Sequence, residues 1–262
     1  MRGGARSRHG PIVMTAVADI ARACGLPWMP VAVAPPPAHD PAGAWDRLDV
    51  LASSPALASH LAVVRAESEG RHDVATAFVA ARFASPLARM AIVPVLTRGR
   101  VLALAPAQVW LRRDRRGLIT GVRIAGAELS DPAPAALRAA AVEPAVAGYR
   151  LVVTGLRAVG ALGERALWGQ LADTLVAAIG QALGEDAEPA AAAEEAGRWL
   201  RDADPPLWVE PVFARVVAGG RTRLVWRRGS CCLAYRLRAF GLCTGCPLQS
   251  RSQWLAAAAA SG

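Results

Sequence analysis

CCLAYRLRAFGLCTGC, residues 231–246, holds four of the five cysteines of this 262-residue chain. Four thiolates from one short segment are a complete ligand set for a [2Fe–2S] cluster, with two for each iron, or for one tetrahedral zinc ion. Structural zinc is usually held by two C-x₂-C knuckles, and here only Cys243 and Cys246 form one. The spacing therefore favours an iron–sulfur cluster over zinc.

The adjacent pair Cys231 and Cys232 sets a condition on the backbone. Neighbouring side chains on an extended strand point to opposite faces. Both thiols can therefore reach one site only if the chain bends at this pair or if the site extends around it. A centre with two metal ions tolerates this arrangement more readily than one small ion does. Two other interpretations stay open at this level, namely buried apolar cysteines and a disulfide.

Two stretches of the chain resemble one protein family. Residues 228–237 (RGSCCLAYRL) and 241–248 (GLCTGCPL) are similar to the C-terminal signature of the FhuF-like ferric-siderophore reductases, in which C-C-x₁₀-C-x₂-C binds the cluster. Residues 166–172 (ALWGQLA) resemble the Leu-Trp-Gly-Asn helix of the same proteins, with Gln170 in place of the more usual Asn. The resemblance is closest over residues 205–248, weaker over 150–185, and a matter of general pattern before that.

The resemblance implies a [2Fe–2S] protein that reduces siderophore-bound iron(III) by one electron and so releases iron(II) in the cytoplasm. No catalytic residue is expected beyond the cluster. Two other functions stay open: a structural zinc-binding protein, and a [2Fe–2S] electron carrier or sensor without siderophore reductase activity. The cluster ligands that the family motif implies are Cys231, Cys232, Cys243 and Cys246.

The C-terminal part of the chain is strongly basic. Residues 211–262 contain eight arginines and no Asp or Glu, within a chain of net charge +9. Such a surround stabilises an anionic cluster and attracts an anionic chelate or an acidic electron carrier. Trp226 and Tyr235 flank the cysteines and are expected to shield the cluster. The candidates for substrate contact, chosen for their closeness to the cysteines in sequence, are Arg227, Arg228 and Arg236.

Missing motifs exclude several classes of enzyme. The chain has no lysine, which excludes a P-loop lysine and a Schiff base. No G-x-G-x-x-G follows a strand pattern, so a self-contained nicotinamide-dependent reductase of the Rossmann type is excluded as well. A reductase of this sequence therefore needs an external donor, such as a ferredoxin-like protein or a flavin reductase.

Other partners are not indicated by the sequence. It shows no helix-turn-helix pattern and no zinc-finger histidine spacing, so no nucleic-acid partner is expected. The long apolar segment 161–183 carries five charged or amide side chains, which predicts a buried or amphipathic helix rather than a transmembrane span. A cytoplasmic protein with reduced thiols is the consistent interpretation.

The hydrophobic pattern predicts an α+β fold with a mainly helical body, an antiparallel β-hairpin region and a small cysteine-rich C-terminal cap. The turn at 114–117 is expected to join the two strands of the hairpin, and a Pro/Ala stretch at 131–147 is expected to separate the two halves of the chain. His60 is expected on a helix surface or in the core, and Trp168, Trp199 and Trp208 in the core. Helices are expected over 55–68, 73–91, 160–184 and 189–202.

These elements suggest three parts in chain order. Residues 1–43 form an irregular N-terminal segment, because the proline run at 35–37 breaks regular structure. Residues 44–206 form the helical and β-hairpin body, which ends before the Asp204–Pro206 breaker. Residues 207–262 form the C-terminal [2Fe–2S]-binding segment.

Overall fold

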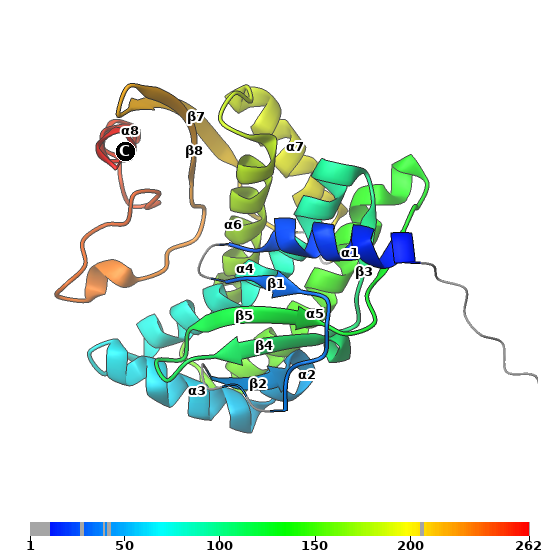
Figure 1. Cartoon of the computed structure of the whole chain (residues 1–262). Coiled ribbons are helices and arrows are strands. Elements are labelled where there is room, and N and C mark those ends of the chain that lie inside the picture. The colour runs from blue at the N-terminus through cyan, green and yellow to red at the C-terminus, as the bar shows by residue number, and fades with distance from the viewer. Residues whose placement is uncertain (1–10, 27–28, 39, 41–42, 205–206, 262) are drawn as a thin grey trace, which may run out of the picture.

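The computed structural model describes residues 11–26, 29–38, 40, 43–204 and 207–261. Its central element is α4 (His72–Arg98), which is buried along most of its length. Helices α3 (Ser54–Glu67), α5 (Leu137–Val159) and α6 (Glu164–Leu183) pack around it (Figure 1). A helix that is apolar on every side becomes the core of a bundle, because each face removes apolar surface from water.

A four-stranded sheet covers one side of this bundle. Its order is β1 (Val31–Ala32), β5 (Ile119–Ile124), β4 (Val109–Arg113) and β2 (Ala44–Arg47). Strands β4 and β5 pair antiparallel as the hairpin that the sequence predicts. A smaller ladder joins β3 (Val101–Ala103) to β6 (Glu128–Ser130), and α2 (Leu48–Leu51) links β2 to α3.

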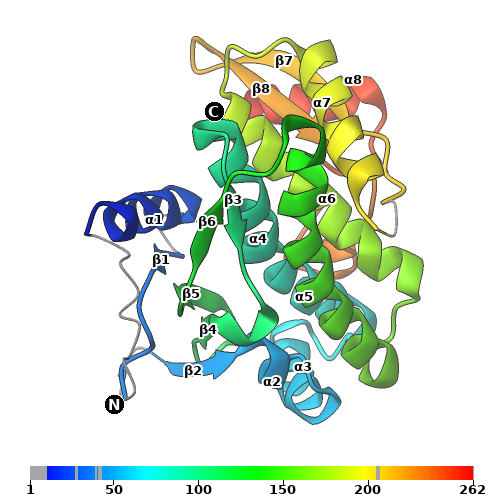
Figure 2. The ribbon, with the colours of Figure 1, turned by 90° about the vertical axis from the view of Figure 1, so that its right-hand side faces the viewer.

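The C-terminal lobe, residues 212–260, stands at one end of the molecule (Figure 2). It consists of the hairpin β7 (Val212–Ala218) and β8 (Arg221–Arg227), a loop that holds four cysteines, and α8 (Arg251–Ala260). The hairpin packs on α6 and on α7 (Pro189–Asp202). Gly180 of α6 permits this approach, because a Cβ there would lie 2.7 Å from the Phe213 ring of β7.

The α+β class and most of the expected helices are confirmed. Two expectations are wrong. Pro11–Cys24 forms helix α1, with Ile20, Ala21 and Cys24 buried, where an irregular segment was expected. The stretch 131–147 does not separate two halves, because α5 begins at Leu137 and continues through Pro144. The prolines at 35–37 lie after α1 and do not interrupt it, whereas in α5 the burial of alanine and aliphatic side chains outweighs the signal of Pro144.

The expected burial of individual side chains is confirmed in part. His60 is buried, and Trp199 is fully buried. Trp168 is half-buried and packs against the core. The assignment of Trp208 to the core is wrong, since 83% of its surface is exposed.

Helix α4 is long and apolar enough to cross a membrane by length and composition. However, 72% of its most apolar window is buried inside the fold. This burial is typical of the core helix of a globular protein, so the segment most suited to a bilayer is already covered by the protein's own helices.

His60 gives the fold a pH dependence that can be measured. Its Nε2 lies 2.7 Å from the Gly117 carbonyl oxygen in the β4–β5 turn, and burial lowers the pKa of the imidazole from 6.5 to about 4. Below pH 6.5 the His60 imidazole binds a proton in the unfolded chain but stays neutral in the folded chain. The free energy of unfolding therefore falls as the pH falls towards 4. We expect a loss of about 1.5 kcal/mol between pH 8 and pH 5.5 from this residue.

Urea unfolding of the wild type and of His60→Leu at both pH values tests this. The loss of stability between the two pH values should be about 1.5 kcal/mol smaller in the variant, because leucine does not titrate. The Gly117 carbonyl still accepts from Arg82 at 3.1 Å, so the substitution does not leave it without a partner. Equal losses in the two proteins would show that His60 is not the titrating group.

Candidate metal centre

The cysteine segment, residues 228–248, lies between β8 and α8 and runs as a long loop beside the body (Figure 1). It contains one short 3₁₀ turn, Ala234–Arg236, and a tight turn in which the Cys246 N–H donates to the Cys243 carbonyl at 2.9 Å. The four cysteines are free thiols. Cys246 is buried and the other three are half-buried, so the disulfide interpretation is not supported by this structure.

Electrostatic contacts connect the four thiols. The hydrogen bond between Cys243 and Cys232 lowers the pKa of Cys232 to about 5 and raises that of Cys243. Burial raises the pKa of Cys231, and the charges of Cys232 and Cys246 act in the same direction. Metal binding and thiol deprotonation are linked, so a cation competes with the protons of such thiols.

A residue with a left-handed backbone follows the adjacent cysteines. Leu233 has φ 62° and ψ 6°, and its N–H donates to Cys231 Sγ at 3.4 Å. The chain therefore turns directly after Cys232. A bend at the pair itself, or a site that extends around it, stays a prediction. A non-glycine residue in this region costs about 1 kcal/mol, and such strain clusters at functional sites. Leucine carries no preference for this conformation, so no residue type in the sequence indicates this turn.

Asp173 on α6 fixes the start of the cysteine segment. Its carboxylate is 4% exposed and accepts hydrogen bonds from the N–H groups of Gly229 at 2.7 Å and Ser230 at 3.0 Å, and from the Ser230 hydroxyl. Arg228 forms an ion pair with it at 3.4 Å. Burial raises the pKa of Asp173, and Arg228 and the hydrogen bonds oppose this shift. A buried acceptor with this many partners locks the loop that leads into Cys231.

The Trp-Gly-Gln motif of α6 lies against the same place. The Gln170 amide donates to Ser230 Oγ and to the Cys231 carbonyl, both at 3.2 Å, and its oxygen accepts from Arg228 at 2.6 Å. Gly169 leaves the room for this contact, because a Cβ there would lie 2.8 Å from the Ser230 Cβ. The motif thus positions the backbone of the first cysteine.

A second anchor holds the middle of the segment on the turn between α3 and α4. Arg236 forms an ion pair with Asp73, and the Arg238 N–H donates to Glu69 Oε1 at 2.8 Å. Glu69 is itself in a left-handed conformation, with φ 51°. The cysteine segment is therefore hydrogen-bonded to α6 at its start and to the beginning of α4 at its middle.

The three arginine candidates have different roles in the structure. Arg227 donates to the Pro247 carbonyl at 2.8 Å and to the Gln249 carbonyl, so it closes the loop onto α8. Arg236 is engaged by Asp73 and lies 6.0 Å from the Tyr235 ring centroid. Only Arg228 lines a cavity beside a cysteine.

That cavity has a volume of about 410 Å³ and lies between α6, β8 and the cysteine segment. Its lining includes Cys243, Trp226, Arg228 and Trp254. A second cavity of about 410 Å³ shares Trp226 and Thr244 with the first and continues towards the end of α6. Small-molecule sites have volumes of this order.

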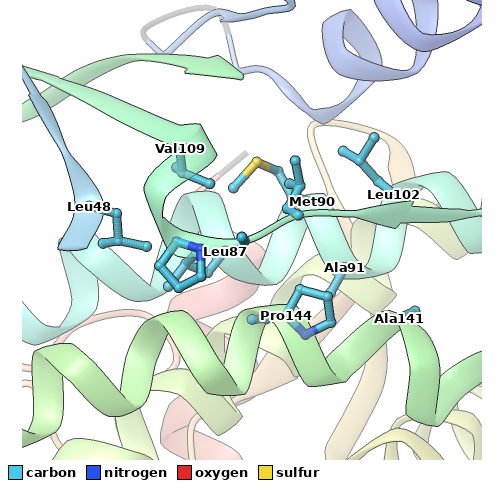
Figure 3. Close-up of a pocket in the computed structure, with 12 residues that line it drawn as sticks. Leu48, Leu87, Met90, Ala91, Leu102, Val109, Ala141 and Pro144 are labelled. Carbon is cyan, nitrogen blue, oxygen red and sulfur yellow. The ribbon is translucent and has the colours of Figure 1, made fainter. Parts of the chain in front are cut away.

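An apolar pocket in the body offers no comparable space. It lies between α4, α5 and β3, with Leu87, Met90 and Pro144 directed into it (Figure 3). Its free volume is about 10 Å³, roughly that of one water-sized probe. It is a packing defect of the core. Two open hollows of about 440 and 560 Å³ lie on the body, beside Trp168 and beside Gln108, but no cysteine lines either of them.

The donor set of the segment consists of four thiols. Among the residues that the structure describes, no group of three or more His, Cys, Asp or Glu side chains converges closely enough to hold one metal ion. A [2Fe–2S] cluster needs two thiolates for each iron and spreads four ligands over two centres. The contact between Cys232 and Cys243 shows that thiols from the two halves of the motif can approach in pairs.

The comparison with protein families agrees with this chemistry. Residues 228–248 match the family model described as FhuF 2Fe-2S C-terminal domain. No curated protein matches the chain. The resemblance is thus confirmed for the cysteine segment, and the cofactor of this segment is a [2Fe–2S] cluster.

Proposed function

We propose that this chain, whose residues 228–248 are a FhuF-type 2Fe–2S domain, is a cytoplasmic ferric-siderophore reductase. A cluster bound by Cys231, Cys232, Cys243 and Cys246 would supply one-electron transfer. Each turnover takes one electron from an external donor and converts one iron(III) into one iron(II). Iron(II) binds more weakly to the hard oxygen ligands of siderophores, so it is released.

The observation that carries this proposal is the cavity that Cys243 lines. Electron transfer requires that the iron chelate approach the cluster closely, and a cavity at a ligand position provides that approach. The indole rings of Trp226 and Trp254 form its walls. They give the cavity apolar surface on two elements, β8 and α8.

Arg228 belongs to this cavity, but its charge is largely balanced. Asp173 lies 3.4 Å away and Gln170 accepts one of its N–H groups. In the neighbouring cavity, Arg223 and Glu185 form a similar pair at 3.5 Å. We therefore expect the cavity to select a chelate by shape and apolar contact, and Arg228 to hold the cysteine segment in place.

The test fills the cavity without touching a cysteine. Ala177 of α6 lines the cavity, so Ala177→Phe should occupy space needed by a bulky ferric siderophore. The cluster-loaded chain is reduced, freed of reductant and mixed with ferric hydroxamate or ferric catecholate chelates, with iron(II) trapped by a chromogenic ligand. We expect the rate to fall about tenfold, equal to about 1.4 kcal/mol of barrier. Ala191→Phe, at an exposed position of α7, is the matched control.

Unchanged rates in Ala177→Phe with every chelate would show that substrate does not use this cavity. No iron(II) from any ferric chelate with the wild-type chain would overturn the reductase proposal. The protein would then be a [2Fe–2S] carrier or sensor.

A further inference from the structure

Four large apolar side chains are exposed around the cysteines. Phe240 and Leu248 are each 56% exposed, Leu242 is 45% exposed and Tyr235 is 40% exposed. Each lies within three residues of a cysteine, which limits its distance from that cysteine to about 11 Å of chain. Elsewhere in the described chain, exposed residues of this size are spread singly over several elements. A concentration of exposed apolar groups at one site marks an interaction surface.

None of these four residues is among those that line the two cavities. The cavity beside Cys243 is bounded by α6, β8 and Trp254, whereas Phe240, Leu242 and Leu248 extend from the loop into solvent. The cysteine segment therefore offers two different approaches. One is concave and suits a small chelate, and the other is exposed and suits a protein surface.

The charge of the exposed approach is positive. Three carboxylates of the body reach the segment, but Asp173, Asp73 and Glu69 are engaged by Arg228, Arg236 and the Arg238 N–H. The side chains of Arg238 and Arg251 are exposed, and within the described part of the chain they have no carboxylate partner. These two arginines and the four apolar residues are exposed side chains within residues 235–251, and we call this set the outer face: Tyr235, Arg238, Phe240, Leu242, Leu248 and Arg251.

Two alternative occupants fit this face less well. A second copy of the chain would bring the same arginines against it, and like charges across an interface are unfavourable. A membrane-surface helix needs a basic polar face and an exposed aromatic or leucine face, whereas α8 has one arginine and a buried Trp254.

We propose that the outer face docks an acidic one-electron carrier protein. This rests on the proposed function in one respect, namely that the electron for iron reduction enters there. The carrier loses one electron and the cluster gains one, so no further reactant is needed. Electron-transfer complexes have small interfaces, below about 1,200 Å², which a few apolar side chains with a basic rim can supply. Chelate and carrier then occupy different sides of the cluster.

The experiment uses the full chain with its cluster and an acidic plant-type [2Fe–2S] ferredoxin as the probe. Binding is measured at about 20 mM and about 500 mM NaCl, where screening differs strongly. Reduction of the cluster by reduced ferredoxin is followed by absorbance. We expect Phe240→Ser with Leu242→Ser, and Arg238→Gln with Arg251→Gln, each to raise Kd about tenfold. The second pair should also lose most of the salt dependence.

Val217→Ser with Arg221→Gln, at the far end of the β7–β8 hairpin, is the matched control and should change Kd less than about twofold. An unchanged EPR signal in all variants shows that the cluster and its fold are intact. Ferredoxin binding that is equal in all variants overturns the proposal. So does binding of phosphatidylserine vesicles without binding of ferredoxin, or a dimer that the variants dissociate. If ferredoxin binds as expected but no ferric chelate is reduced, the docking face stands and the reductase function fails.

Discussion

Replacement of Cys243 by serine is expected to abolish the [2Fe–2S] cluster. The wild-type chain, purified without oxygen, should contain about two iron and two sulfide and give an S = 1/2 EPR signal after reduction. Cys243 is one of the four proposed ligands and lines the cavity, and each iron of the cluster needs two thiolates, so the substitution should leave one iron short of a ligand. The variant should retain almost no iron or sulfide, and the signal should disappear.

Cys24→Ala is the matched control for this experiment. Cys24 is fully buried against α4, and burial raises the pKa of its thiol to about 12, so it behaves as an apolar residue. Its replacement should leave the iron content unchanged. A full cluster in Cys243→Ser would remove Cys243 from the ligand set. One zinc and no sulfide in the wild-type chain would instead make the cysteines structural.

Removal of the Asp173 carboxylate should release the cysteine segment from the body. Asp173→Ala leaves the N–H groups of Gly229 and Ser230 without their acceptor and leaves Arg228 without its counter-charge. Loss of one partner of a buried ion pair costs about 3–5 kcal/mol. We expect a loss of this size in the free energy of unfolding, together with poor retention of the cluster.

Two further variants show whether the loss of stability comes from the missing charge of Asp173 and whether it is specific to this position. Asp173→Asn keeps an oxygen acceptor but loses the charge, so its loss of stability should be smaller. Glu194→Ala removes an exposed carboxylate that pairs with Arg198 on α7, and exposed pairs contribute little. Urea unfolding and iron analysis of the three proteins provide the measurements. An unchanged unfolding midpoint in Asp173→Ala would refute the anchoring role.

The sequence predicted the cofactor and the segment that holds it because their chemistry is local. Residues 231–246 contain four thiols in one short segment, so no knowledge of the fold was needed to bring them together. The helices over 55–68 and 189–202 followed from periodicity, which depends on neighbours three and four residues apart. By contrast, α5 was missed because Pro144 and the alanines around it gave a breaker signal that tertiary burial overrides.

The residues that anchor the cysteine segment to the body were not predictable, because they lie far from it in the sequence. Asp173 lies 56 residues before Gly229, and Asp73 lies 163 residues before Arg236. In the sequence, an anchoring carboxylate on a helix cannot be distinguished from a solvent-exposed one. The difference arises only when the fold places an N–H group or an arginine against it. The turn at Leu233 was not predictable for a different reason, since a leucine side chain carries no preference for a left-handed backbone.

The two anchors also determine when the site can form. The residues of the body that hold the cysteine segment, namely Glu69, Asp73, Gln170 and Asp173, all precede it in the chain. A ribosome therefore makes both anchors before it makes the first ligand, and domains fold from the N-terminal side as they emerge. Cluster insertion becomes the last step of maturation, on a body that is already folded. Iron supply would then decide how many finished chains become active, rather than how many chains fold.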